Sequence, residues 1–176
     1  MRRCWLFFYG TLMQDHDNAL TRTILPMLEG GRWAFVSGRL LAARSPYGWY
    51  PVLCAGNGRV AGRLYRAGPR FTARHLRLLG IPDRVVVDAY EEWDQRRPAR
   101  SEYRRMNVRV AIAGGGMVTA QAYRHNRPVH AGLRVIPGGD FSAFVARRRL
   151  CAFGSSAGAV PPLPVRSPAL PMDARP

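Results

Sequence analysis

Apolar and polar residues alternate along several stretches of the chain, as they do in strands that bury one face. The alternation is clearest over residues 105–112 and is also present over residues 59–66. Residues 33–43 and 117–124 read as extended as well. Gly114-Gly115-Gly116 separates two of these segments, which predicts a hairpin between them. The pattern therefore predicts a sheet whose strands are half-buried.

The first apolar segment and the helices complete this outline. The run from Trp5 to Tyr9 is short and aromatic and stops at Gly10, which is typical of a buried strand that leads into a loop. Helical spacing and capping residues predict helices from Asn18 to about Leu28, from Thr72 to Gly80, over residues 84–94, and from Asp140 to about Arg149. Pro26 is expected to disturb the last turn of the first helix.

Length and composition indicate one folded domain with a tail. The chain has 176 residues, of which 47% are hydrophobic, so its core needs no metal or disulfide. Beyond Phe153 the sequence is rich in proline and offers little that packs. We therefore expect a domain over residues 1–153 and a disordered tail over 154–176.

The formal net charge of +16 raises the question of a nucleic-acid partner. All 27 basic residues are arginine, and they are spread over the whole chain. Genomic base composition explains such a bias without any ligand, and dispersed charge makes a poor binding footprint. The charge is interpreted as a basic surface, and a nucleic-acid partner is not expected.

Cysteine and histidine positions bear on the cellular compartment and on metal binding. The three cysteines are far apart in the sequence, and neither they nor the four histidines show metal-ligand spacing. We expect no metal site and a reduced, cytoplasmic environment. The apolar run after Arg2-Arg3 is too short for a signal peptide, and no stretch has the roughly 18–20 apolar residues of a membrane span.

A series of short motifs follows a recognisable order through the chain. They are Tyr9-Gly10-Thr11-Leu12, Gly38-Arg39-Leu40, Tyr50-Pro51, Val60-Ala61-Gly62-Arg63-Leu64-Tyr65, Asp88-Ala89-Tyr90-Glu91, Tyr103-Arg104-Arg105 and Gly139-Asp140-Phe141. This ordered set, over about residues 5–145, resembles the gamma-glutamylcyclotransferase-like family. The resemblance implies an α+β fold, in which a mixed sheet closes into a small barrel with flanking helices and a cavity at one end. It implies no cofactor.

The resemblance also implies a reaction and the residues that perform it. The free α-amine of a small-molecule gamma-glutamyl substrate would attack its own side-chain carbonyl, which releases 5-oxoproline and an amine, amino acid or peptide. Glu91 would be the catalytic general acid and base, and Tyr9, Gly10, Thr11 and Leu12 would form the substrate-binding loop.

Some interpretations stay open at this stage. Periodicity alone places Glu91 on the polar face of its helix, with Asp88, Glu92 and Gln95. Glu92 also departs from the family pattern, which has Gly there, so a non-catalytic small-molecule-binding domain on the same fold is the main alternative. A basic nucleic-acid-associated protein is a weaker one. Arg105 would either pair with a carboxylate in the core or face water.

Overall fold

The computed structural model of the protein describes residues 4–71 and 87–155. The strands in these ranges are β1 (Trp5–Phe8), β2 (Leu28–Ser45), β3 (Gly48–Ala67), β4 (Tyr103–Ile112), β5 (Met117–His125) and β6 (Arg134–Val135). The α-helices are α1 (Ala19–Ile24), α3 (Val87–Tyr90) and α4 (Phe141–Arg148), and 3-10 turns occupy Leu25–Met27, Pro98–Arg100 and Pro137–Gly139. The helix predicted from Thr72 to Gly80, and the predicted tail after residue 155, lie outside the described residues.

The sheet closes on itself into a small barrel of five strands. Their order is β3-β1-β5-β4-β2, and β2 pairs with β3 along most of its length to complete the ring. β1 runs parallel to β5, with Leu6 opposite Gln121, and the other pairings in the ring are antiparallel. β6 pairs with β2 outside the ring. The expected α+β fold, a mixed sheet closed into a barrel with flanking helices, is confirmed.

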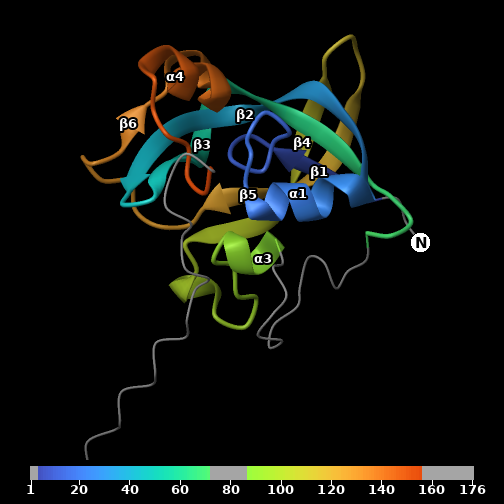
Figure 1. The fold of residues 1–176 in the computed structure, drawn as a ribbon, viewed down its shortest axis with the longest axis horizontal. Helices are drawn as coiled ribbons and strands as arrows, with labels where there is room; N and C mark the ends of the chain where they lie inside the picture. Colours follow the sequence, from blue (N-terminus) through green and yellow to red (C-terminus); the bar gives the residue numbers. More distant parts are fainter. Residues whose placement is uncertain (1–3, 72–86, 156–176) are drawn as a thin grey trace, which may run out of the picture.

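The two larger hydrophobic clusters of the described residues lie on the two faces of the barrel wall. Alternate residues of the strands fill the interior, including Phe7 of β1, Val60 of β3 and Val110 of β4, and Phe141 and Phe144 of α4 pack against them. The intervening residues of β1, Leu6 and Phe8, point outward into a second core with α1 and Val87 of α3. In Figure 1, α4 lies above the barrel strands and α3 lies below them.

The capping residues predicted for two helices act as expected. Asn18 caps α1, since its side-chain oxygen accepts a hydrogen bond from the backbone N–H of Thr21 at 2.8 Å. α1 ends at Ile24, because the chain then tightens into the 3-10 turn that contains Pro26. Asp140 caps α4 by accepting from the backbone N–H of Ala143 at 2.9 Å.

Candidate active site

The segment from Tyr9 to Leu12 leaves the end of β1 and is buried throughout. The Tyr9 hydroxyl donates a hydrogen bond to the backbone oxygen of Tyr123 at 2.5 Å, which ties the start of the loop to β5. Burial raises the pKa of Tyr9 well above its ordinary value, and the charge of Glu91 raises it further. The structure therefore brings Tyr9 near Glu91, although 82 positions separate them in the sequence (91 − 9).

Packing against β3 requires glycine at position 10. A Cβ atom on Gly10 would lie 2.0 Å from Cγ of Pro51, far inside van der Waals contact. Pro51 is fixed in turn from β4, because the Tyr103 hydroxyl donates to its backbone oxygen at 2.8 Å. The turn continues with a hydrogen bond from the backbone N–H of Met13 to the oxygen of Gly10 at 2.9 Å. Gly10 thus lets the loop lie directly on the β3 segment that contains Pro51.

The other two predicted loop residues are held from α1 and from the outer core. The backbone oxygen of Thr11 accepts hydrogen bonds from the side chains of Asn18 and Thr21, the latter at 3.1 Å. Leu12 is 2% exposed, and its side chain packs in the outer core. The start of α1 therefore fixes the course of the loop.

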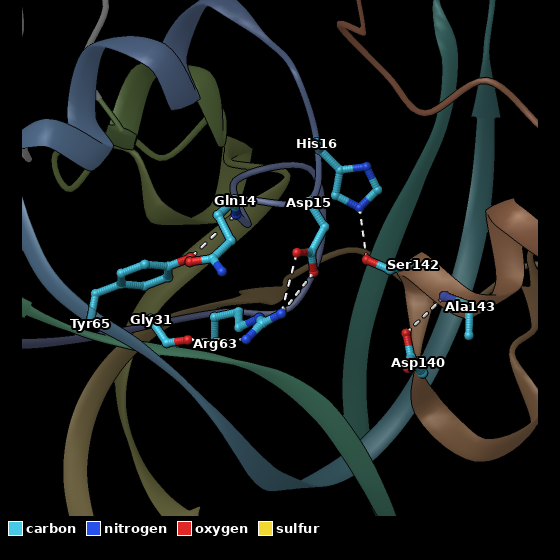
Figure 2. Close-up of polar contacts among 9 residues, drawn as sticks. All are labelled: Gln14, Asp15, His16, Gly31, Arg63, Tyr65, Asp140, Ser142 and Ala143. Carbon is cyan, nitrogen blue, oxygen red and sulfur yellow. Dashed lines mark hydrogen bonds and ion pairs between the residues drawn. The ribbon is translucent and has the colours of Figure 1, made fainter.

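Figure 2 shows how the chain is anchored just beyond this loop. The backbone N–H of Gln14 donates to the Tyr65 hydroxyl at 3.2 Å, and the carboxylate of Asp15 pairs with Arg63 at 3.3 Å. Nε2 of His16 lies 3.0 Å from the Ser142 hydroxyl of α4. Burial lowers the pKa of His16, against the opposite influence of the carboxylates of Asp15 and Asp140. These contacts fix the loop against β3 and α4.

Glu91 sits at the C-terminal end of α3, in a Schellman motif. The backbone N–H of Trp93 donates to the oxygen of Asp88 at 2.8 Å, and Glu92 adopts a left-handed conformation with φ of 50°. The helix predicted over residues 84–94 therefore ends at Tyr90, four residues early; residues 84–86 lie outside the described ranges. A helix end favours glycine at this left-handed position, which gives a backbone reason for the glycine that the family resemblance implies where this chain has Glu92. Glu92 is exposed.

The carboxyl of Glu91 has an unusually high proton affinity. Burial raises its pKa from the ordinary 4.5 to about 8, and the negative charges of Glu102 and Asp88 add to the effect. The charge of Glu91 also contributes to the raised pKa values of Tyr103 and Tyr123, after the larger effect of burial. The charge of Glu91 thus acts on three buried tyrosines, Tyr9, Tyr103 and Tyr123.

Asp88 is not on a solvated face, which corrects the interpretation from periodicity. It is 5% exposed and lies against β4 and β5. Nε of Arg105 donates to its Oδ1 at 2.8 Å and Nη2 to its Oδ2 at 3.2 Å, while the Tyr123 hydroxyl donates to Oδ1 at 2.6 Å. Arg105, left open from the sequence, therefore pairs with a carboxylate in the core. Its Nη1 also donates to Gln121 at 2.6 Å.

Sequence reasoning missed two further groups near Glu91. Tyr123 shares a face of β5 with Gln121, two positions before it, and this alternation was the signal that could have found it. Glu102 carries a charge that raises the pKa values of both Glu91 and Tyr50. Burial raises the pKa of Tyr50 to about 12, with a further contribution from Glu102.

Within residues 4–71 and 87–155, no group of three or more His, Cys, Asp or Glu side chains is arranged to hold a metal ion. None of the helices described there is long and apolar enough to cross a membrane.

Comparison with known proteins yields a family and a fold. The model of a family described as gamma-glutamyl cyclotransferase, AIG2-like, matches residues 6–143. No curated protein matches the chain significantly. An AIG2-like protein from Mus musculus is similar in structure, with 20% identity, a TM-score of 0.50, and 78% of this chain and 97% of that chain covered. YkqA from Bacillus subtilis is also similar in structure, with 20% identity and a TM-score of 0.53. The match covers 84% of this chain but only 42% of the length of YkqA.

Proposed function

The chain belongs to the gamma-glutamyl cyclotransferase, AIG2-like family, and from that membership we propose that it is a cyclotransferase that releases 5-oxoproline from a gamma-glutamyl compound. In the proposed reaction the α-amine of the gamma-glutamyl group attacks the side-chain carbonyl carbon. A new C–N bond closes the five-membered ring, and the original amide C–N bond breaks. The leaving nitrogen departs with one proton more than it had in the amide. Because the ring closes within one molecule, holding the glutamyl chain folded supplies much of the acceleration.

The observation that carries the proposal is the position and pKa of Glu91. The attacking amine loses a proton and the leaving nitrogen gains one, so a single carboxyl can carry the proton from one to the other. An effective general acid and base has a pKa near the working pH. With a pKa of about 8, the Glu91 carboxyl both holds and releases a proton in the neutral range. An ordinary surface glutamate, ionised at pH 7, is a poor acid.

The Tyr9–Leu12 loop supplies the second part of the proposed mechanism. As the amine attacks, negative charge develops on the carbonyl oxygen, and backbone N–H groups stabilise such a charge when they are fixed beforehand. The loop backbone is fixed in this way, by Pro51 against Gly10 and by the side chains of α1 against Thr11. We propose that N–H groups of this loop bind the oxyanion or the substrate carboxylate. Tyr9, with its hydroxyl engaged by β5, would shape the wall beside Glu91.

A panel of gamma-glutamyl compounds tests the proposal. The panel includes amides of an amino acid, a dipeptide and a polyamine, and 5-oxoproline is measured by mass spectrometry. We expect release from at least one compound, and kcat/KM should rise with pH toward about 8 as Glu91 loses its proton. The Glu91→Gln variant is the matched control and should release none above background. If the protein binds panel compounds in calorimetry but releases no 5-oxoproline, the non-catalytic binding domain is the better description.

A further inference from the structure

The ion pair between Asp88 and Arg105 involves the same turn that contains Glu91. Its two side chains are 7% and 11% exposed, so it is shielded from solvent, unlike the Arg66–Glu29 pair at the surface. Buried ion pairs of this kind contribute little net stability compared with apolar residues of similar volume. A stability role alone is therefore a weak explanation for it.

Asp88 controls the geometry around Glu91 through both its backbone and its side chain. Its backbone oxygen receives the Trp93 N–H that closes the Schellman motif, and Glu91 lies inside that closed turn. Arg105 donates hydrogen bonds to both oxygens of its carboxylate, which attaches the turn to β4. The described part of α3, Val87–Tyr90, leads directly into this turn. The direction of Glu91 therefore depends on how Asp88 is anchored.

Tyr123 links this anchor to the proposed substrate loop. Its hydroxyl donates to Asp88, and its backbone oxygen accepts from the hydroxyl of Tyr9, at which the loop begins. One residue of β5 therefore fixes the distance between the loop and the turn that carries Glu91.

We propose that Asp88, held by Arg105 and Tyr123, is a positioning residue that sets the place of the Glu91 carboxyl. The proposal rests on the function proposed for Glu91 above. Asp88 itself is enclosed by Arg105 and Tyr123, so it acts on the reaction through Glu91.

The charged and titratable groups that face Glu91 come from several elements. They are Asp88 on α3, Glu102 before β4, Tyr103 on β4, Tyr123 on β5 and Tyr9 after β1. Asp88 and Glu102 are the carboxylates whose charge makes Glu91 harder to ionise. Replacing Asp88 by asparagine removes one of these negative charges and leaves the positive charge of Arg105 without its partner carboxylate. The lost negative charge and the unpaired positive charge both favour ionisation of Glu91.

The test is a ¹³C NMR titration of Glu91 in the folded protein, with selectively labelled glutamate and assignment by the Glu91→Gln variant. In Asp88→Asn we expect the titration midpoint to fall by roughly one pH unit. We also expect kcat to fall by about 10–100-fold, with KM changed by less than about threefold, because the carboxyl is displaced relative to the bound substrate. Tyr123→Phe keeps both charges, so its midpoint should stay near the parent's while kcat falls. A purely structural role would lower the folded fraction without moving the midpoint.

Two further variants of this protein make the test decisive. If Asp88→Asn does not fold, Asp88→Asn combined with Arg105→Gln leaves no unpaired buried charge. In this double variant kcat should again fall, and the midpoint should fall by less than in Asp88→Asn, because the positive charge of Arg105 is removed as well. Glu29→Gln is the matched control, since it breaks an ion pair with Arg66 that is not among the charges acting on Glu91. A folded Asp88 variant with parental midpoint and kcat overturns the proposal. If the parent makes no 5-oxoproline, the proposed function fails, and the titration still decides the role of Asp88.

Discussion

Replacing Glu91 by glutamine keeps the shape of the side chain and removes its ionisable proton, and we expect the variant to lose catalysis and gain stability. A positioned general acid and base contributes about 10²–10⁴-fold to a rate. The corresponding increase in the activation barrier is about 3–5.5 kcal/mol.

The gain in stability follows from the pKa of Glu91. In the folded protein the carboxyl has a pKa of about 8, against an ordinary value of 4.5 in the unfolded chain. Between these values the native state binds more protons than the unfolded state, so the free energy of unfolding of the parent falls as pH rises. The penalty is absent below pH 4.5, reaches about 3 kcal/mol at pH 7, and stops growing above pH 8. Glutamine carries no such penalty.

Urea unfolding of the parent and the variant at pH 4.5, 7 and 8.5 measures this difference, and 5-oxoproline release measures the loss of activity. We expect Glu91→Gln to become more stable relative to the parent as pH rises. Glu92→Gln is the neighbouring control; because Glu92 is exposed, it should stay within a few-fold of parental activity. A stability difference that is equal at all three pH values would refute the buried, protonated carboxyl. An active Glu91→Gln with an inactive Glu92→Gln would show that the wrong glutamate had been assigned.

Two further substitutions test the backbone of the site. Glu92→Gly should raise the free energy of unfolding by about 0.5–1 kcal/mol, because glycine adopts the left-handed conformation at φ of 50° without strain. Glu92→Ala is the control. If thermal melts show an equal gain in stability for Glu92→Ala, this reason is wrong. Gly10→Ala should lower the unfolding free energy in urea by about 1–3 kcal/mol and abolish 5-oxoproline release, since its Cβ would collide with Pro51. Parental stability in Gly10→Ala would show that the loop moves away from Pro51 freely.

Local patterns in the sequence were enough to predict the elements of this fold. The alternation over 105–112 became β4, and Asn18 and Asp140 cap α1 and α4 as their positions suggested. The glycines at 114–116 all have positive φ and lie between β4 and β5. Such features depend on residues a few positions apart, so the sequence displays them directly. The ordered motifs likewise led to the family and to the barrel.

Tertiary structure alone decided which polar residues are buried and what their chemistry becomes. Helical spacing placed Asp88 and Glu91 on one polar face, and nothing nearby in the sequence showed that Arg105, 17 positions away, would pair with Asp88 in the core. The Tyr9 hydroxyl meets the backbone of Tyr123 across 114 positions, through the parallel pairing of β1 with β5. Burial and neighbouring charges set a pKa, and both arise when distant strands close into a barrel. The residue type made Glu91 a candidate acid, and the closed fold raised its pKa to about 8.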